Sequence, residues 1–123
     1  MHLLSFGHIK HKHLTFKIND LYFDIRDDLI SCSSKKSGVV RTVQKNYLKQ
    51  QKVKKFYRKK ILKKVLKTLK KRKHTRWKIF IGDHDGLIES VVFIEQLERD
   101  LIKKCNIHST VEHLTINEQF KIL

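Results

Sequence analysis

Aspartates and histidines near the start of the sequence have the residue types of a metal site. The candidate ligands are Asp20, Asp24, Asp27 and Asp28, together with His8, His11 and His13. Converging carboxylates could hold the metal ions of a nuclease, and histidines two apart share one face of a strand. However, the aspartates fall in predicted turns or opposite the apolar face, and the histidines have no evident third ligand. We therefore expect no metal, no cofactor and no catalytic residue.

Positive charge is the stronger functional signal. From Leu29 to Gly82 the sequence has 20 Lys and Arg and no Asp or Glu, whereas the remainder has 8 basic and 12 acidic residues. The stretch therefore carries +20, the remainder −4, and the whole chain +16. So much like charge repels itself unless a polyanion neutralises it, which indicates RNA or DNA. No apolar run approaches the roughly 20 residues of a membrane span, and the apolar side of the basic stretch is expected to pack on protein, so no membrane partner is expected. No Ser/His/Asp spacing or nucleotide-binding loop appears, so no small-molecule substrate is expected either.

Within this stretch, apolar residues recur at helical spacing from about residue 43 to residue 72, and lysines occupy the opposite side. Phosphate-binding candidates on this outer face are Lys52, Lys59, Lys63, Lys67 and Lys70. Phe56 is predicted to lie among them, where it would either stack on a base or ribose or pack against protein. Before the helix, the loop SSKKSG could clamp a phosphate through Lys35 and Lys36 or be a solvated turn. Further candidates towards the helix start are Arg41 and Lys45.

The segment GDHDG, residues 82–86, precedes a second predicted helix. Free N–H groups at a helix start attract anions, so the backbone at Gly82 and Gly86 could contact RNA. Two aspartates in the same segment oppose a phosphate. Capping of the helix by Asp85 is therefore the favoured interpretation, and RNA contact is the second.

These residues must be positioned by a single α/β domain covering residues 1–123. Alternating apolar residues predict strands over 14–18 and 21–25, with a short third strand over 29–33, together forming an antiparallel meander. A helix over 43–72, a strand over 77–81, a helix over 88–104 and a last strand over 107–116 would follow. The predicted order is β-β-β-α-β-α-β, with a mixed β-sheet and two packed helices. Residues 1–12 are expected to form a flexible basic arm.

Several of these segments resemble the small-subunit ribosomal protein eleven family of bacteria and organelles. HLTFKINDLYFDIRD, residues 13–27, is similar to the family's first hairpin, and LISCSS, residues 29–34, to its third strand. GDHDGLIES, residues 82–90, is similar to its glycine loop and helix start, and EHLTI, residues 112–116, to a later motif. The Lys-rich helix is longer than the family's, the glycine-loop arginine is absent, and no basic Pro-rich tail precedes Leu123.

The resemblance implies a structural role on the platform of the small ribosomal subunit, near the messenger exit. The partners would be ribosomal RNA and neighbouring small-subunit proteins. Lys outnumbers Arg by 22 to 6 and Pro is absent, a bias that fits an A/T-rich genome. A mitochondrial ribosome is therefore the expected location, with a cytoplasmic ribosome as the alternative. The other functions left open are a non-ribosomal nucleic-acid-binding protein and a metal-dependent nuclease.

Overall fold

The computed structural model describes residues 1–27, 36–72 and 74–121, and these form a parallel β-sheet with helices packed on it. The strands are β1 (His2–Gly7), β2 (Leu21–Asp24), β3 (Lys78–Asp83) and β4 (Thr110–His113). Their order across the sheet is β2-β3-β1-β4, and every neighbouring pair is parallel. The carboxyl ends of all four strands therefore meet at one edge of the sheet, which we call the carboxyl edge.

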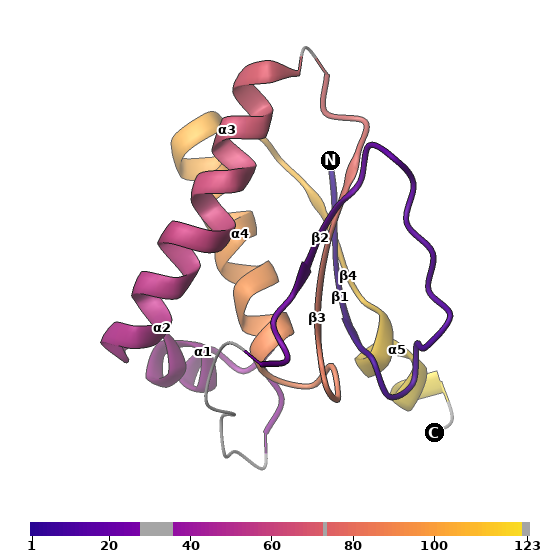
Figure 1. Cartoon of the computed structure of the whole chain (residues 1–123). Coiled ribbons are helices and arrows are strands. Elements are labelled where there is room, and N and C mark those ends of the chain that lie inside the picture. The colour runs from indigo at the N-terminus through magenta and orange to yellow at the C-terminus, as the bar shows by residue number, and fades with distance from the viewer. Residues whose placement is uncertain (28–35, 73, 122–123) are drawn as a thin grey trace.

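Residues 41–71 form a nearly continuous helical arm between β2 and β3. It comprises α1 (Arg41–Leu48), α2 (Gln51–Phe56), a π-helical segment η1 (Tyr57–Leu62) and α3 (Lys63–Lys71). The helix α4 (Glu89–Cys105) connects β3 to β4, and α5 (Leu114–Lys121) follows β4 directly. The helical arm and α4 lie on one face of the sheet, whereas the loop between β1 and β2 crosses the other face (Figure 1). The two faces follow from the strand order, since connections of one hand that run in opposite directions pass on opposite sides.

The main core lies between the sheet and the helices. Leu3, Ile79 and Ile81 of the sheet are fully buried against Ile61 and Val65 of the helical arm and against α4. Tyr57 stacks on Phe93 of α4 with ring centroids 5.9 Å apart. The apolar stripe of the helical arm is thus buried in the core, and the opposite side of the arm faces outward.

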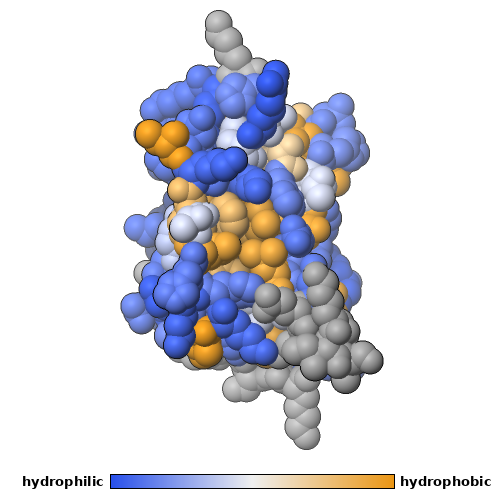
Figure 2. Space-filling view, turned by 90° about the vertical axis from the view of Figure 1, so that its right-hand side faces the viewer, coloured by the Kyte–Doolittle hydropathy of each residue, from blue (hydrophilic) through white to orange (hydrophobic). Residues whose placement is uncertain are grey.

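A smaller apolar cluster covers part of the opposite sheet face. Leu4, Phe6 and Phe80 project from β1 and β3, and Leu14 and Phe16 of the β1–β2 loop pack on them. Phe16 also stacks on Tyr22 at 4.4 Å. Seen from this side, apolar residues gather at the centre of the molecule within a hydrophilic surround (Figure 2).

The predicted α/β class is confirmed, and the helices over 43–72 and 88–104 and the strand over 77–81 have counterparts in the structure. The antiparallel meander is wrong, because all pairs among the described strands are parallel. Residues 14–18 form a loop. Their alternating pattern arises because Leu14 and Phe16 turn towards the sheet from outside it. The third strand predicted over 29–33 lies outside the described residues.

Both ends of the predicted element order also need correction. Residues 2–7, expected in a flexible arm, form a strand between β3 and β4. Their run LLSF is buried on both faces, and such a strand has no alternating pattern to reveal it. The last strand ends at His113, and residues 114–121 are helical.

Candidate nucleic-acid interface

The outward side of the helical arm presents the predicted lysines to solvent. Between Arg41 and Lys71 the sequence has 14 Lys and Arg and no acidic residue. All five lysines of the predicted outer face are exposed: Lys52, Lys59, Lys63, Lys67 and Lys70. Because Val53, Tyr57 and Val65 are buried beneath them, these lysines reach solvent without disturbing the core.

No salt bridge joins these lysines to a carboxylate within the part of the chain that the structure describes. Each pair of like charges three or four residues apart destabilises a helix by roughly 0.2–0.5 kcal/mol. The helical arm therefore carries repulsion that a bound polyanion would relieve. This arrangement can bind phosphate.

The other predicted RNA-binding residues are less uniform. Lys36, Arg41 and Lys45 are exposed, and Arg41 donates to the side chain of Gln44 at 3.1 Å, whereas Lys35 lies outside the described residues. Phe56 is half-buried and packs towards the core, with its ring 5.9 Å from that of Phe93. Packing against protein is thus the alternative that its position favours over stacking on a base.

Gly82 and Gly86 are buried, so neither presents its backbone to RNA as predicted. Gly86 has φ +75°, and a Cβ there would lie 2.4 Å from the backbone nitrogen of Gly7. A Cβ at Gly82 would meet the rings of Phe6 and His8 at 2.5 and 2.6 Å. These glycines are required for the close approach of β1 to the loop after β3.

Asp83 holds this loop in place. One carboxylate oxygen accepts the N–H of Gly86, and the other accepts the N–H of Ser90 at 2.9 Å in the first turn of α4. An aspartate does cap the helix, but it is Asp83; Asp85 accepts the N–H of Leu87 at 3.0 Å within the loop. Burial raises the pKa of Asp83 to about 6, although the two N–H donors favour its charged form.

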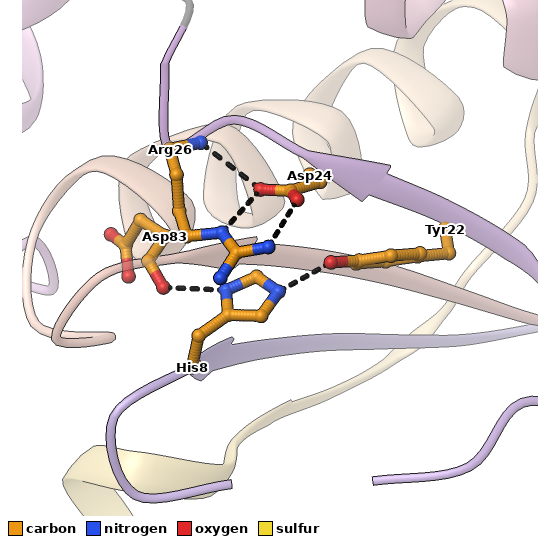
Figure 3. Close-up of polar contacts among 5 residues, drawn as sticks. All are labelled: His8, Tyr22, Asp24, Arg26 and Asp83. Carbon is orange, nitrogen blue, oxygen red and sulfur yellow. Dashed lines mark hydrogen bonds and ion pairs between the residues drawn. The ribbon is translucent and has the colours of Figure 1, made fainter. Parts of the chain in front are cut away.

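Polar side chains from three strands meet at the carboxyl edge (Figure 3). The Nδ1–H of His8 donates to the carbonyl oxygen of Asp83 at 2.8 Å. A neutral His8 ring then accepts the Tyr22 hydroxyl at Nε2. Beside them, Asp24 and Arg26 form a bidentate ion pair. Arg26 donates from Nε to Oδ1 of Asp24 at 2.9 Å and from Nη2 to Oδ2 at 2.7 Å.

These contacts shift the pKa values of Asp24 and Tyr22. The Arg26 guanidinium lowers the pKa of Asp24, whereas burial and the nearby Asp24 charge raise the pKa of Tyr22. Asp24 is thus held as a carboxylate already paired with a cation. Its partner makes it a poor metal ligand, in agreement with the expectation that it is a surface group.

The described residues that could hold a divalent cation are Asp83, Asp85 and Glu89, whose carboxylate oxygens lie within 4.8 Å of one another. Sequence reasoning placed the metal candidates elsewhere, among the early aspartates and histidines. Both oxygens of Asp83 already accept backbone N–H groups, so this carboxylate is engaged in holding the loop and α4 together.

A buried hydrogen-bonded relay, not anticipated from the sequence, links β1, β4 and α4. His113 donates from Nε2 to Glu95 at 3.0 Å, and its Nδ1 shares a 2.6 Å hydrogen bond with the Ser5 hydroxyl. These residue types resemble a hydrolase triad, but Ser5 is fully buried in the central strand and no substrate can reach it. His113 lowers the pKa of Glu95. The relay fixes β4 and α4 to β1, and Ser5 and His113 are 108 positions apart in the sequence.

Neither protein-family models nor curated proteins match this chain. Among the described residues, no helix is long and apolar enough to cross a lipid bilayer. The interpretation of the interface therefore depends on the chain's own geometry and charge.

Proposed function

We propose that this protein binds RNA as a structural component of a small ribosomal subunit. The observation that carries the proposal is the helical arm, with 14 basic and no acidic residues and an outer face of five exposed lysines. RNA phosphates would be neutralised by these lysines, with release of condensed counterions. A folded RNA that repels itself would be stabilised in the same way.

The burial of the arm's apolar stripe supports a nucleic acid over a membrane surface. A helix that lies on a membrane inserts its apolar side among the lipids. Here Val53, Ile61 and Val65 are buried against the protein's own core and are not available for insertion. Charge alone then mediates binding, as in contacts with a phosphate backbone.

The polar clusters support a structural role over catalysis. Asp24 is ion-paired, Asp83 accepts two backbone N–H groups, and Ser5 is buried. Each of these groups has a partner that accounts for its position in the fold.

The ribosomal setting depends on the resemblance of short segments to the small-subunit ribosomal protein eleven family. From residue 41 to residue 113 the structure has the order helix, strand, helix, strand. This is also the order that the sequence predicts for these residues. The segment over residues 13–27 does not form the hairpin that the resemblance implies, because only Leu21–Asp24 is a strand and it pairs in parallel with β3. Ribosomal RNA and neighbouring small-subunit proteins are the proposed partners, and a mitochondrial ribosome is the proposed location.

Sucrose gradients at high salt test this proposal directly. The protein should sediment in proportion to the small-subunit peak, and affinity purification should recover small-subunit ribosomal RNA. Recovery mainly with DNA, or in the free pool, would reject the ribosomal role. Metal-dependent RNA cleavage that is lost in Asp24→Asn would favour the nuclease instead.

A further inference from the structure

A groove lies between the helical arm and α4. It consists of two adjoining hollows of about 460 and 300 Å³, which share Leu48, Lys54 and Gln96 in their walls. The basic residues that line the two hollows are Arg41, Lys45, Lys49, Lys54, Arg58 and Lys104. They come from α1, the turn after it, α2, η1 and α4, so the groove exists only in the folded protein.

The groove is positive throughout. Among the described residues that line it, Asp100 is the only acid, against six cations. Asp100 accepts the Tyr57 hydroxyl at 2.6 Å and the Gln96 amide at 3.3 Å, so its role is to hold η1 to α4. All six cations are exposed and can therefore turn towards a bound group.

A third guanidinium, that of Arg99, stands close to one end of the groove. Arg99 donates to Gln96 at 2.9 Å, and burial together with the nearby Arg41 charge lowers the pKa of Arg99. The charges of Glu95 and Asp100 act on Arg99 in the opposite direction, so this guanidinium already has carboxylates beside it. The positive charge available to a ligand therefore comes from the six cations that line the groove.

The dimensions favour a single strand over a duplex. The helical arm and α4 pack directly, with Tyr57 stacked on Phe93, and packed helix axes are about 8–10 Å apart. An RNA duplex is wider than this spacing between helices and cannot enter the groove. Gln96 and Lys104 are eight residues apart on α4, or about 12 Å, which spans three to four nucleotides of a strand that keeps the stacked spacing of about 3.4 Å.

We infer that this groove binds the sugar–phosphate backbone of a single-stranded RNA segment of about three to four nucleotides. The inference depends on the proposed RNA-binding function and adds to it a second contact surface with a different preference. The outer lysine face is open and accepts the phosphates of a duplex, whereas an unpaired segment binds preferentially in the groove. The groove accepts only a strand that is unpaired.

Two variants of equal charge change separate the surfaces. Lys49→Gln, Lys54→Gln and Arg58→Gln remove charge from the groove, and Lys59→Gln, Lys63→Gln and Lys67→Gln remove it from the outer face. Binding of an eight-nucleotide oligouridylate and of a blunt RNA duplex is measured across a salt series, with folding checked by circular dichroism. For the oligouridylate, the groove variant should flatten the slope of log affinity against log salt by about 2, at about 0.7 for each phosphate contact. The outer-face variant should change that slope by less than half as much.

The outcomes distinguish the two proposals. Equal losses from the two variants, or a loss of duplex binding from the groove variant alone, would overturn the groove assignment and leave RNA binding intact. Failure of the unaltered protein to bind either RNA would overturn both. Asp100→Asn is a third variant to test, because asparagine retains a side-chain oxygen that can accept the hydrogen bond from the Tyr57 hydroxyl. It should tighten oligouridylate binding by about two- to fivefold at low salt, and unchanged or weaker binding by the folded variant would contradict the inference.

Discussion

Replacing Asp83 with asparagine tests whether burial or hydrogen bonding dominates at the carboxyl edge. Burial raises the pKa of this carboxyl from 3.8 to about 6 in the folded protein. The difference corresponds to about 3 kcal/mol. Because the folded state binds the proton more tightly than the unfolded state, this contribution is present below about pH 4 and is lost as the pH rises through about 6.

Asparagine cannot take up this proton, so comparing the two proteins isolates Asp83. We expect the free energy of unfolding of the unaltered protein, minus that of Asp83→Asn, to increase by up to about 3 kcal/mol as the pH falls from 7 to 4. At pH 7 the variant should already be less stable by about 1–3 kcal/mol, because its NH₂ group opposes one of the N–H donors of Gly86 and Ser90.

Urea denaturation followed by circular dichroism, repeated across this pH range, measures the difference. Asp85→Asn is the matched control, since Asp85 lies in the same loop but is exposed. A difference that shrinks as the pH falls would mean that the two N–H donors outweigh burial and lower the pKa. That result would refute the reasoning.

Three further predictions concern folding and binding. Gly86→Ala should destabilise the protein by at least about 1–2 kcal/mol in urea denaturation, because Gly86 has a positive φ and no room for a Cβ; a loss below 0.5 kcal/mol would contradict the described loop. Val65→Asp should abolish the cooperative thermal transition by burying a charge at a fully buried position, whereas Lys63→Asp, on the exposed side, should retain it. Small-subunit ribosomal RNA should raise the thermal midpoint of the unaltered protein at low salt, and identical midpoints with and without it would count against RNA binding.

Local patterns predicted the helical arm and α4 well, whereas α5 was not predicted. The buried stripe Val53, Tyr57, Ile61 and Val65 repeats every four residues, so the arm's inner and outer sides follow from helical geometry alone. Exposed lysines on the outer side follow from the same pattern. The break at residues 49–50 and the π-helical segment were not predicted, since nothing in that Lys-rich sequence punctuates the helix.

Strand pairing was predicted poorly, because it depends on contacts between distant segments. Leu14 and Phe16 alternate as in a strand, yet they cover the sheet from a loop. The groove was missed for the same reason, since Lys54 and Lys104 lie on helices far apart in the sequence. Lys103 and Lys104 do signal an exposed end of α4, but only the packed structure shows that Lys104 lines the same hollow as Lys54 of α2.

The position of β1 has a kinetic consequence. His2 pairs with Lys78 on one side and with Thr110 on the other, so the central strand gains its partners only after most of the chain has been synthesised. Closing such long loops slows folding, whereas the helices of the arm can form from local contacts alone. A nascent chain would therefore expose the apolar run of β1 for a long interval, in which it is prone to aggregate. A partner that engages the helical arm early would shorten this interval by holding the chain in a native-like arrangement.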